Sequence, residues 1–344
     1  MDRRIDLTCY FGENVTLQKT IELAQRAEAL GYDTLWVGEA WGRDAFTSLT
    51  NLACHTSRVK LATGVVNIHS RPPSTTAQSI ASLDAISGGR AVLGLGAGSP
   101  KIAEDWHGVP FDKPVERMRE YVQVVRAMLA GQRMDHHGTF YHAKDFRMAA
   151  RTVQERLPVY LAALGPRMVE LVGESADGWL PNYVAPRYLP VLRARIEAGA
   201  ARMGRKAADI MTSYRIITCA SGDGEQARAA VRQDLGFVIG AYGPFYRDLV
   251  ARAGFAEEAA HIRTLWETDR KRVASGVTEA MLDALTVAGT PEECRQRYDE
   301  LRALGLQAIN VSLPLFCSPD LVRETIEALG PVAFDSPERW DMAR

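Results

Sequence analysis

The sequence predicts an α/β fold, a TIM (β/α)8 barrel with insertions, on three observations. Short apolar runs alternate with helical runs almost throughout the chain, as in parallel α/β folds. Residues 60–99 hold two apolar runs around one helical stretch with no room for a hairpin, which indicates a parallel βαβ unit. Eight such strands within 344 residues fit a barrel better than an open sheet. We therefore expect a single TIM-barrel domain over residues 1–344.

Each expected strand is a short apolar run, and each expected helix carries apolar positions at helical spacing. The strands cover residues 5–10, 34–37, 60–66, 90–95, 159–163, 178–181, 211–219 and 307–313. The helices cover residues 16–30, 45–55, 74–86, 115–129, 167–174, 186–203, 225–239 and 319–329. Asn14 or Thr16 is suited to cap the first helix, and Gly31 is suited to end it.

Two stretches depart from the strand–helix repeat. Residues 131–147 are polar and rich in turn residues, which predicts a hairpin insertion. Residues 240–289 predict a largely helical insertion before the last strand. Insertions of this kind commonly form substrate walls or subunit contacts.

Composition narrows the class of protein. The chain is 47% apolar with a formal net charge of −1, which provides no general attraction to nucleic acid. Its five cysteines include no C-x-x-C pair, which argues against a zinc site or a disulfide framework. The first residues lack a signal-peptide core, and no apolar stretch has the length of a membrane span. We expect a cytoplasmic protein with a small-molecule ligand, without a membrane or nucleic-acid partner and without a metal.

Candidate functional residues lie where expected strands end, because barrels bind ligands at the carboxyl ends of their strands. Glu39 follows the second strand and could face the barrel mouth; the alternative is a surface ion pair with Arg43. Gly64 ends the third strand. A glycine there permits the close approach of a flat ligand; the alternative is a simple turn. Asn67 adds an amide that both donates and accepts hydrogen bonds. Arg71 could bind a phosphate or brace the loop.

Two later loops expose backbone N–H groups. The loop from Gly94 to Ser99 looks like a dinucleotide fingerprint, but Ser99 replaces its last glycine and we expect no helix immediately after it. A Rossmann dehydrogenase is therefore not favoured. The segment 162–168 runs from the fifth strand into a helix with Pro166 in its first turn, which suits a phosphate or an ordinary turn.

The histidines of the hairpin insertion do not predict a metal site. His136, His137 and His142 lack carboxylates at ligand spacing in the sequence, so we expect them in a solvated loop.

Several long segments together resemble the luciferase-like monooxygenase superfamily. They are LGYDTLWVGEA, LATGVVNIHSRPPSTTAQSIASLDAISGGRAVLGLGAG and PVYLAALGPRMVELVGESADGWLPN. With the late segment EAMLDALTVAGTPEECRQRYDELRALGLQAINVSLP, they are most similar to its coenzyme F420-dependent branch, typified by methylenetetrahydromethanopterin reductase.

This resemblance implies a TIM barrel with the deazaflavin F420 across its carboxyl mouth. It implies a carboxylate beside the deazaflavin head group at Glu39, and a non-prolyl cis peptide at Gly64–Val65 behind the ring. Further cofactor contacts are implied at Asn67, Ala97 and Gly98, and the region that receives the phosphate at Leu164, Gly165, Arg167 and Met168.

The sequence departs from its relatives at two positions. Sugar-phosphate dehydrogenases of the family have a proton-donating His where this chain has Ala40. They and the methanopterin reductases have an acid where this chain has Ser99, which we keep as a candidate catalytic position. Glu39 is the first candidate proton donor. Weaker candidates are Tyr10, Asp44 and His69.

The expected function is hydride transfer between coenzyme F420 and a C=N or polarised C=C bond of a small molecule, by an enzyme that forms a homodimer or higher homo-oligomer. One alternative is a luciferase-like monooxygenase that uses FMN. Another is a barrel that binds the cofactor without turnover.

Overall fold

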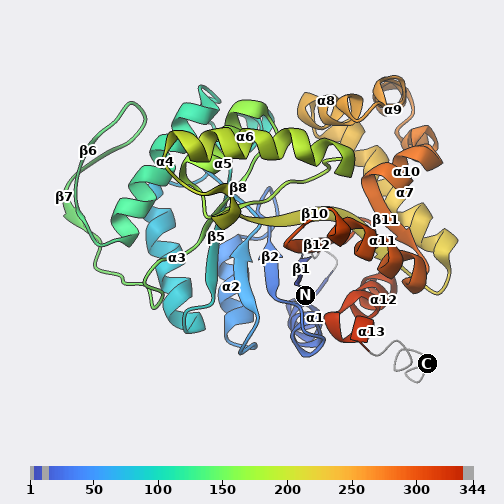
Figure 1. Ribbon diagram of the computed structural model, residues 1–344, viewed down its shortest axis with the longest axis horizontal. Helices are drawn as coiled ribbons and strands as arrows, with labels where there is room; N and C mark the ends of the chain where they lie inside the picture. Colours follow the sequence, from blue (N-terminus) through green and yellow to red (C-terminus); the bar gives the residue numbers. More distant parts are fainter. Residues whose placement is uncertain (1–3, 10–14, 336–344) are drawn as a thin grey trace. The chain divides into compact units, whose positions relative to one another are not determined.

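The structure, a computed structural model, describes residues 4–9 and 15–335 (Figure 1). The chain divides into two units. The central unit comprises Thr34–Leu180 and Arg193–Met211, and the terminal unit comprises Met1–Asp33, Pro181–Leu192 and Thr212–Arg344. A single domain over residues 1–344 stays a prediction.

The central unit contains a parallel sheet of short, mostly buried strands. They are β2 (Thr34–Val37), β3 (Lys60–Thr63), β4 (Val66–Asn67), β5 (Ala91–Gly96), β8 (Val159–Ala162) and β9 (Gly178–Trp179). Their order is β2-β3-β5-β8-β9, and β4 also pairs with β5. The register places Trp36 beside Ala62, and Leu95 beside Leu161. Because every pair is parallel, the carboxyl ends of these strands lie at the same edge of the sheet.

Helices follow the strands of the central unit. They are α2 (Ala45–Ala53), α3 (Pro73–Ser87), the π-helix η1 (Lys101–Trp106), α4 (Pro114–Leu129), α5 (Pro166–Ser175), α6 (Leu189–Arg202), whose first turn belongs to the terminal unit, and the 3₁₀ helix η3 (Ala207–Asp209). Proline opens α3, α4 and α5, where its missing N–H breaks no intrahelical bond.

Trp36 and Tyr160 form the centre of one core cluster of the central unit. Their rings meet edge to face with centroids 5.3 Å apart. Ala62, Val92 and Leu180 complete the cluster, and the partly buried Val65 packs against it. The strand ends that carry the candidate residues therefore stand on a tightly packed base.

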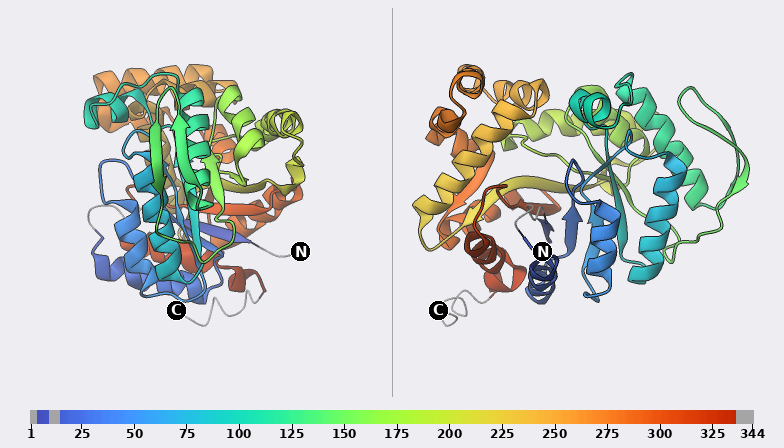
Figure 2. Two further views of the ribbon diagram at one scale, coloured as in Figure 1. Left: turned by 90° about the vertical axis from the view of Figure 1, so that its left-hand side faces the viewer. Right: turned by 180° about the vertical axis from the view of Figure 1, so that it is seen from behind.

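The predicted hairpin insertion is present and projects from α4 (Figures 1 and 2). Its strands are β6 (Arg133–His137) and β7 (His142–Arg147). The Glu120 carboxylate of α4 accepts hydrogen bonds from the backbone N–H groups of Thr139, Phe140 and Tyr141 at 2.7–3.1 Å. One carboxylate therefore anchors the hairpin turn.

The terminal unit contains four parallel strands. They are β1 (Ile5–Thr8), β10 (Met211–Ala220), β11 (Thr286–Gly289) and β12 (Ala308–Ser312), in the order β11-β10-β12-β1. Its helices are α1 (Leu17–Ala29), η2 (Pro186–Tyr188), α7 (Gly224–Ala241), α8 (Pro244–Arg252), α9 (Ala256–Thr268), η4 (Arg270–Gly276), α10 (Glu279–Leu285), α11 (Pro291–Ala303), α12 (Pro319–Leu329) and α13 (Pro331–Asp335). Thr16 caps α1 through the Lys19 N–H at 3.2 Å, and Gly31 follows its end with φ +85°, as predicted.

The fold class is the predicted (β/α)8 barrel. Its eight strands, in chain order, are β1, β2, β3, β5, β8, β9, β10 and β12. No helix within residues 4–9 and 15–335 is long and apolar enough to cross a membrane.

The structure corrects three expectations. The run 60–66 is not one strand, because it breaks after Thr63 and resumes at Val66. A helix does follow the glycine loop closely, since η1 begins at Lys101. The segment 240–289 is helical as predicted except at its end, where β11 extends the sheet by pairing with β10. The sequence analysis also missed α11, which begins with a capping box between Thr290 and Glu293.

Candidate functional site

The candidate cofactor-binding residues, with Glu39 and Ser99, belong to the central unit, at the carboxyl ends of four neighbouring strands. Glu39 follows β2, the Gly64–Val65 pair separates β3 from β4, and the glycine loop follows β5. The fourth segment, between β8 and α5, contains Leu164, Gly165, Arg167 and Met168. Parallel pairing brings these segments to the same edge of the sheet.

The Gly64–Val65 peptide is cis, as the resemblance implied. Hydrogen bonds attach this bulge to the end of β2 on both sides. The Gly64 N–H donates to the Val37 carbonyl at 2.7 Å, and the Glu39 N–H donates to the Val65 carbonyl at 3.2 Å. The position of Glu39 is thus set by the backbone of the bulge.

Glycines of β5 make room for this bulge. A Cβ at Gly96 would lie 2.6 Å from Cγ2 of Val65, and a Cβ at Gly94 would lie 2.0 Å from the Thr63 carbonyl oxygen. Both are closer than non-bonded atoms tolerate, so side chains at these positions would displace the bulge. The G-x-G spacing in β5 therefore serves close packing of neighbouring backbone rather than a dinucleotide turn.

Glu39 is held by a bidentate ion pair with Arg71. Nη1 and Nη2 of Arg71 lie 2.6 and 2.7 Å from its two carboxylate oxygens. The same carboxylate accepts the Ala45 N–H at the start of α2 at 3.1 Å and the Ser70 hydroxyl at 3.4 Å. The Glu39 side chain is 10% exposed, so this is a largely buried pair rather than a surface contact.

Arg71 also pairs with Asp44, which caps α2 through the Thr47 N–H at 2.6 Å. Burial raises the pKa of Asp44, but the hydrogen bond from Thr47 and the charge of Arg71 outweigh this effect and lower the pKa below its usual range. The Asp44 carboxylate is therefore stabilised as an anion. This geometry weakens Glu39 and Asp44 as proton donors and gives Arg71 the bracing role.

Asn67 organises the loop that follows the bulge. Its Oδ1 accepts the N–H groups of His69 and Ser70 at 2.7 and 2.9 Å, and its Nδ2 lies 3.4 Å from Nε2 of His107. The Ile68 N–H donates to the Gly96 carbonyl at 3.1 Å. The side-chain amide of Asn67 therefore orders the loop internally, and the backbone of Ile68 attaches the loop to β5.

His69 has one committed nitrogen and one without a partner. Its Nδ1 lies 3.0 Å from the Ala97 carbonyl, which can only accept, so Nδ1 carries a hydrogen. Its Nε2 is buried and has no hydrogen-bond partner in the described part of the chain. Burial and the charge of Arg117 lower the pKa of His69. The neutral ring therefore presents Nε2 as an acceptor, not as a proton donor.

Ser99 lies between the glycine loop and η1. Its hydroxyl oxygen accepts the Ile102 N–H at 3.4 Å, and its carbonyl accepts the Ala103 N–H at 2.9 Å. Gly98, with φ +71°, lets the chain turn beside Asn67. Ser99 precedes the π-helix and accepts from its first turn, and its hydroxyl hydrogen has no acceptor within residues 4–9 and 15–335.

The start of α5 presents free backbone N–H groups. Gly165 is the N-cap residue and provides no side-chain hydrogen bond, and residues 165–167 are exposed. Arg167 extends toward solvent, where it pairs with Glu116, whereas Met168 is buried. Exposed N–H groups at the positive end of a helix suit an anion.

Tyr10 and the histidines of the hairpin insertion are not part of the site described above. Tyr10 is outside the described residues. His136 pairs with Glu120 at 3.1 Å and the exposed His137 with Asp135 at 3.0 Å, both through carboxylates that sequence spacing did not indicate. Within residues 4–9 and 15–335, no cluster of three metal-ligating side chains occurs.

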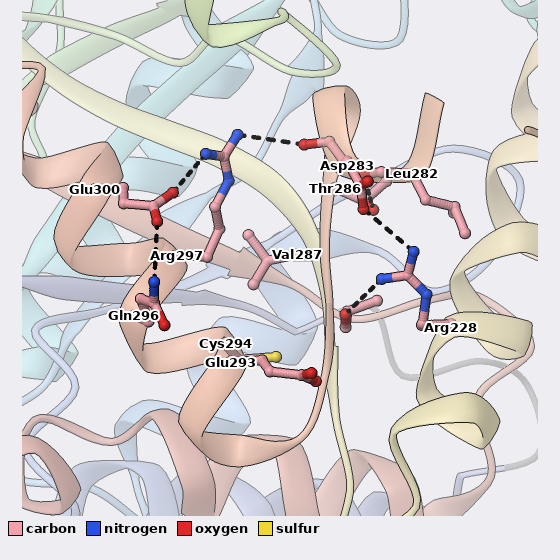
Figure 3. Close-up of a pocket in the computed structure, with 11 residues that line it drawn as sticks. Arg228, Leu282, Asp283, Thr286, Val287, Glu293, Cys294, Gln296, Arg297 and Glu300 are labelled. Atoms are coloured by element: carbon pink, nitrogen blue, oxygen red, sulfur yellow. Dashed lines mark hydrogen bonds and ion pairs between the residues drawn. The ribbon is translucent and has the colours of Figure 1, made fainter. Parts of the chain in front are cut away.

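A cavity of about 340 Å³ lies in the terminal unit, away from every predicted site residue in the sequence (Figure 3). Arg228 and Arg297 line it, and both are already satisfied: Arg228 by Asp283 at 3.2 Å, and Arg297 by Glu300 at 2.7 Å and the Asp283 carbonyl at 3.2 Å. The charged side chains of this cavity pair with one another, so we base the candidate site on the strand ends.

The sequence analysis missed the side-chain contacts that hold the loops of the site in place. Glu39 and Arg71 are 32 positions apart, and Asn67 and His107 are 40 apart. Neither spacing gives a local signal. A signal for Arg71 existed in its position directly before Pro72 and Pro73, where it opens α3 beside the strand ends.

Comparisons with known proteins show the family and the fold of the chain. The family model of luciferase-like monooxygenases matches residues 6–308. A 5,10-methylenetetrahydromethanopterin reductase of Methanolobus tindarius is 32% identical over 302 residues, covering 86% of this chain and 90% of that protein. The structure of the coenzyme F420-dependent tetrahydromethanopterin reductase from Methanopyrus kandleri matches with a TM-score of 0.85 and 27% identity, over 96% of this chain and 99% of that one. A riboflavin lyase structure with modified FMN shares the fold, with a TM-score of 0.76 and 18% identity, over 99% of this chain and 92% of that one.

Proposed function

Because the chain belongs to the luciferase-like monooxygenase family, we propose that it is a coenzyme F420-dependent oxidoreductase that acts on a C=N or polarised C=C bond of a small molecule. The observation that carries this proposal is the bulge at Gly64–Val65. It stands between the ends of β2 and β5, and the β5 glycines leave space for it. When bound, the deazaflavin supplies a carbon that gives or takes a hydride, and the protein supplies orientation.

The residues present fit such a cofactor at two points. The partly buried Val65 side chain and the backbone of Ala97 and Gly98 offer a surface for a flat ring at the strand ends. The exposed start of α5, from Gly165 to Arg167, offers N–H groups and a cation for a phosphate. Leu164 and Met168 frame that turn. In this proposal Glu39 acts by holding Arg71 and the bulge beneath the ring.

Proton handling in this proposal is assigned to groups that keep a free hydrogen or a free lone pair. The Ser99 hydroxyl can donate to a ligand or to an ordered water, since its oxygen already accepts from Ile102. The neutral His69 ring can accept through Nε2. Glu39 and Asp44 are both paired with Arg71. A solvent-derived proton relayed past Ser99 fits these roles.

Titration of the purified protein with oxidised F420 tests the cofactor, with FMN titrated in parallel. We expect F420 to bind and FMN to bind far more weakly. Tight FMN binding without F420 binding would replace the proposal by the flavin-dependent monooxygenase. Stoichiometric F420 binding, with no hydride transfer to any imine, iminium or enone in a screen, would favour the barrel without turnover.

The phosphate seat has its own experiment. The deazaflavin nucleoside that lacks the phosphate tail should bind at least about tenfold more weakly than F420, a difference of about 1.4 kcal/mol. Arg167→Ala should weaken the binding of F420 and leave the binding of the nucleoside unchanged. Arg151→Ala, in an exposed segment outside the site, is the matched control. If Arg167→Ala weakened the binding of both ligands equally, the proposal that the phosphate binds at the start of α5 would be wrong.

A cytoplasmic location and a homodimer belong to the same proposal and derive from the resemblance. Cell fractionation tests the first. Light scattering of the purified protein at several concentrations tests the second, and a monomer at all concentrations would contradict it.

A further inference from the structure

Two thiols of the terminal unit lie in contact. Cys219 is the penultimate residue of β10, and Cys317 lies in the segment between β12 and α12. Their Sγ atoms are 3.9 Å apart. Cys219 is fully buried, whereas Cys317 is partly exposed. Cys317 is therefore open to a small oxidant, and the sulfur of Cys219 lies in contact with the sulfur of Cys317.

The surroundings of the pair favour a thiolate. The hydrogen bond from Cys317 lowers the pKa of Cys219 against the opposing effect of burial, and the Thr325 hydroxyl donates to the same sulfur at 3.8 Å. The same contact raises the pKa of Cys317, as do burial and the nearby Asp234 and Glu324. The two sulfurs thus share one proton after the first ionisation. The shared proton therefore rests mainly on Cys317, and its transfer to Cys219 makes Cys317 the thiolate.

The other three cysteines have no such arrangement. Cys54 is exposed, and Cys9 is buried with its Sγ 4.0 Å from the Leu7 carbonyl. Cys294 directs its thiol to the backbone carbonyl of Cys219 at 3.6 Å, and burial raises its pKa to about 12. Cys294 is the nearest competitor for Cys219, but its sulfur is committed to a backbone oxygen.

We propose that Cys219 and Cys317 form a reversible oxidation site, a disulfide produced by a peroxide. In the singly ionised pair, the remaining proton passes from Cys317 to Cys219, and the Cys317 thiolate attacks a peroxide oxygen, which breaks the O–O bond and forms a sulfenic acid. The departing hydroxide or alkoxide takes the proton of Cys219 and leaves as water or an alcohol, so that Cys219 becomes the thiolate. The Cys219 thiolate then attacks the Cys317 sulfur, which forms the S–S bond and breaks the S–O bond. The hydroxide leaves as water after it takes a proton. Two electrons pass from the thiols to the peroxide, and a dithiol reductant reverses the change.

The bond would tie a loop to a strand at the carboxyl end of β12. The segment between β12 and α12 is held by the Leu315 N–H, which donates to Asp234 of α7 at 2.9 Å, and by Phe316, whose ring centroid lies 5.1 Å from that of Phe237. A disulfide between positions 98 apart adds a long-range cross-link to these contacts. We expect slower hydrogen exchange in residues 313–318 and a higher unfolding temperature after oxidation.

The experiment uses the full chain without any cofactor, so its outcome is separate from that of the proposed function. The protein is titrated with hydrogen peroxide, its thiols are counted after denaturation, and its non-reduced peptides are mapped by mass spectrometry. We expect the loss of two of the five thiols, a peptide pair joined through Cys219 and Cys317, and recovery with dithiothreitol. Cys54→Ser should behave like the wild type apart from its missing thiol.

Cys317→Ser, at a partly exposed position, should abolish the joined peptide and the rise in unfolding temperature. Cys294→Ser should leave both unchanged. Sulfenic or sulfinic acid at Cys54 or Cys317 without any joined peptide overturns the proposal, as does a Cys219–Cys294 link. Peptide mapping of the wild type decides the question even where a variant folds poorly.

Discussion

Single side chains of the candidate site owe their chemistry to partners far along the chain. The sequence places Glu39 at the end of a strand, which is a matter of local pattern. Its orientation comes from Arg71 and from the start of α2. Likewise, His69 is a plain loop residue in the sequence, and the Ala97 carbonyl decides which of its nitrogens is free.

Glu39→Gln should lower the free energy of unfolding by about 1–3 kcal/mol, because the amide replaces a charged acceptor in a largely buried bidentate pair. Urea denaturation measures the change. Glu22→Gln, in the exposed Lys19–Glu22 pair, is the control and should cost less than about 1 kcal/mol. An equal decrease in the free energy of unfolding in both variants would mean that the Glu39–Arg71 pair stabilises the protein no more than an exposed ion pair does.

His69 should contribute to acid sensitivity. Its pKa is lowered in the folded protein, so the unfolded chain takes up this proton first as the pH falls below about 6.5. The free energy of unfolding therefore decreases as the pH falls through that range, until the folded protein is protonated too. His69→Gln should flatten this part of the stability curve, followed by urea unfolding at a series of pH values. An unchanged slope would contradict the prediction.

At the scale of elements, backbone packing decides where strands break and how insertions are attached. The G-x-G pattern of β5 was visible in the sequence, but its purpose was not. Gly94 and Gly96 face the Thr63 carbonyl and Val65, and those contacts exist only because β3 and β4 pair with β5.

Gly96→Ala should destabilise the protein by about 1–3 kcal/mol, because the added Cβ overlaps Val65. Val65→Ala in the same chain should relieve part of this loss, so the two effects should not be additive. Gly42→Ala is the matched control, since a Cβ there meets nothing within 4 Å. Chemical denaturation of both single variants, of the double variant and of Gly42→Ala measures the coupling between positions 96 and 65, and strictly additive losses would exclude the overlap.

Glu120 should control the hairpin. Burial raises its pKa, but hydrogen bonds from the turn backbone and from His136 lower it overall, which marks a stabilised anion. Glu120→Gln should speed hydrogen exchange across β6 and β7 and lower the free energy of unfolding by about 1–2 kcal/mol. Asp145→Asn, in an exposed ion pair with Arg133, should change neither. Unaltered exchange in Glu120→Gln would show that the hairpin is held by other contacts.

For the whole molecule, ligand binding and folding are linked. F420 at about one hundred times its Kd should raise the free energy of unfolding by about 2.7 kcal/mol, since it binds only the folded chain. Urea unfolding with and without F420 measures this shift, and the denaturant slope should stay the same. FMN at the same concentration is the control. Slower hydrogen exchange should appear in residues 64–70 and 97–107, and protection only elsewhere would place the cofactor outside the candidate site.

The sequence by itself determined the fold class, most strands and helices, the hairpin insertion and the family. These features follow from local signals: apolar periodicity, proline and glycine at helix ends, and long motifs such as the segment 60–99. It missed α11 and β11. The strand β11 is a short apolar run at the end of a helical stretch, and only pairing with β10 makes it a strand.

Which side chains contact one another in the site and in the cysteine pair became known only from the tertiary structure. The bidentate contact of Arg71 with Glu39, the tautomer of His69 and the contact of Cys219 with Cys317 join residues 28 to 98 positions apart. Sequence spacing carries no information about such pairs, because the register of parallel strands sets which strand ends meet. For the same reason, the sequence could name Glu39 as a candidate acid, but only its surroundings identify it as a fixed carboxylate.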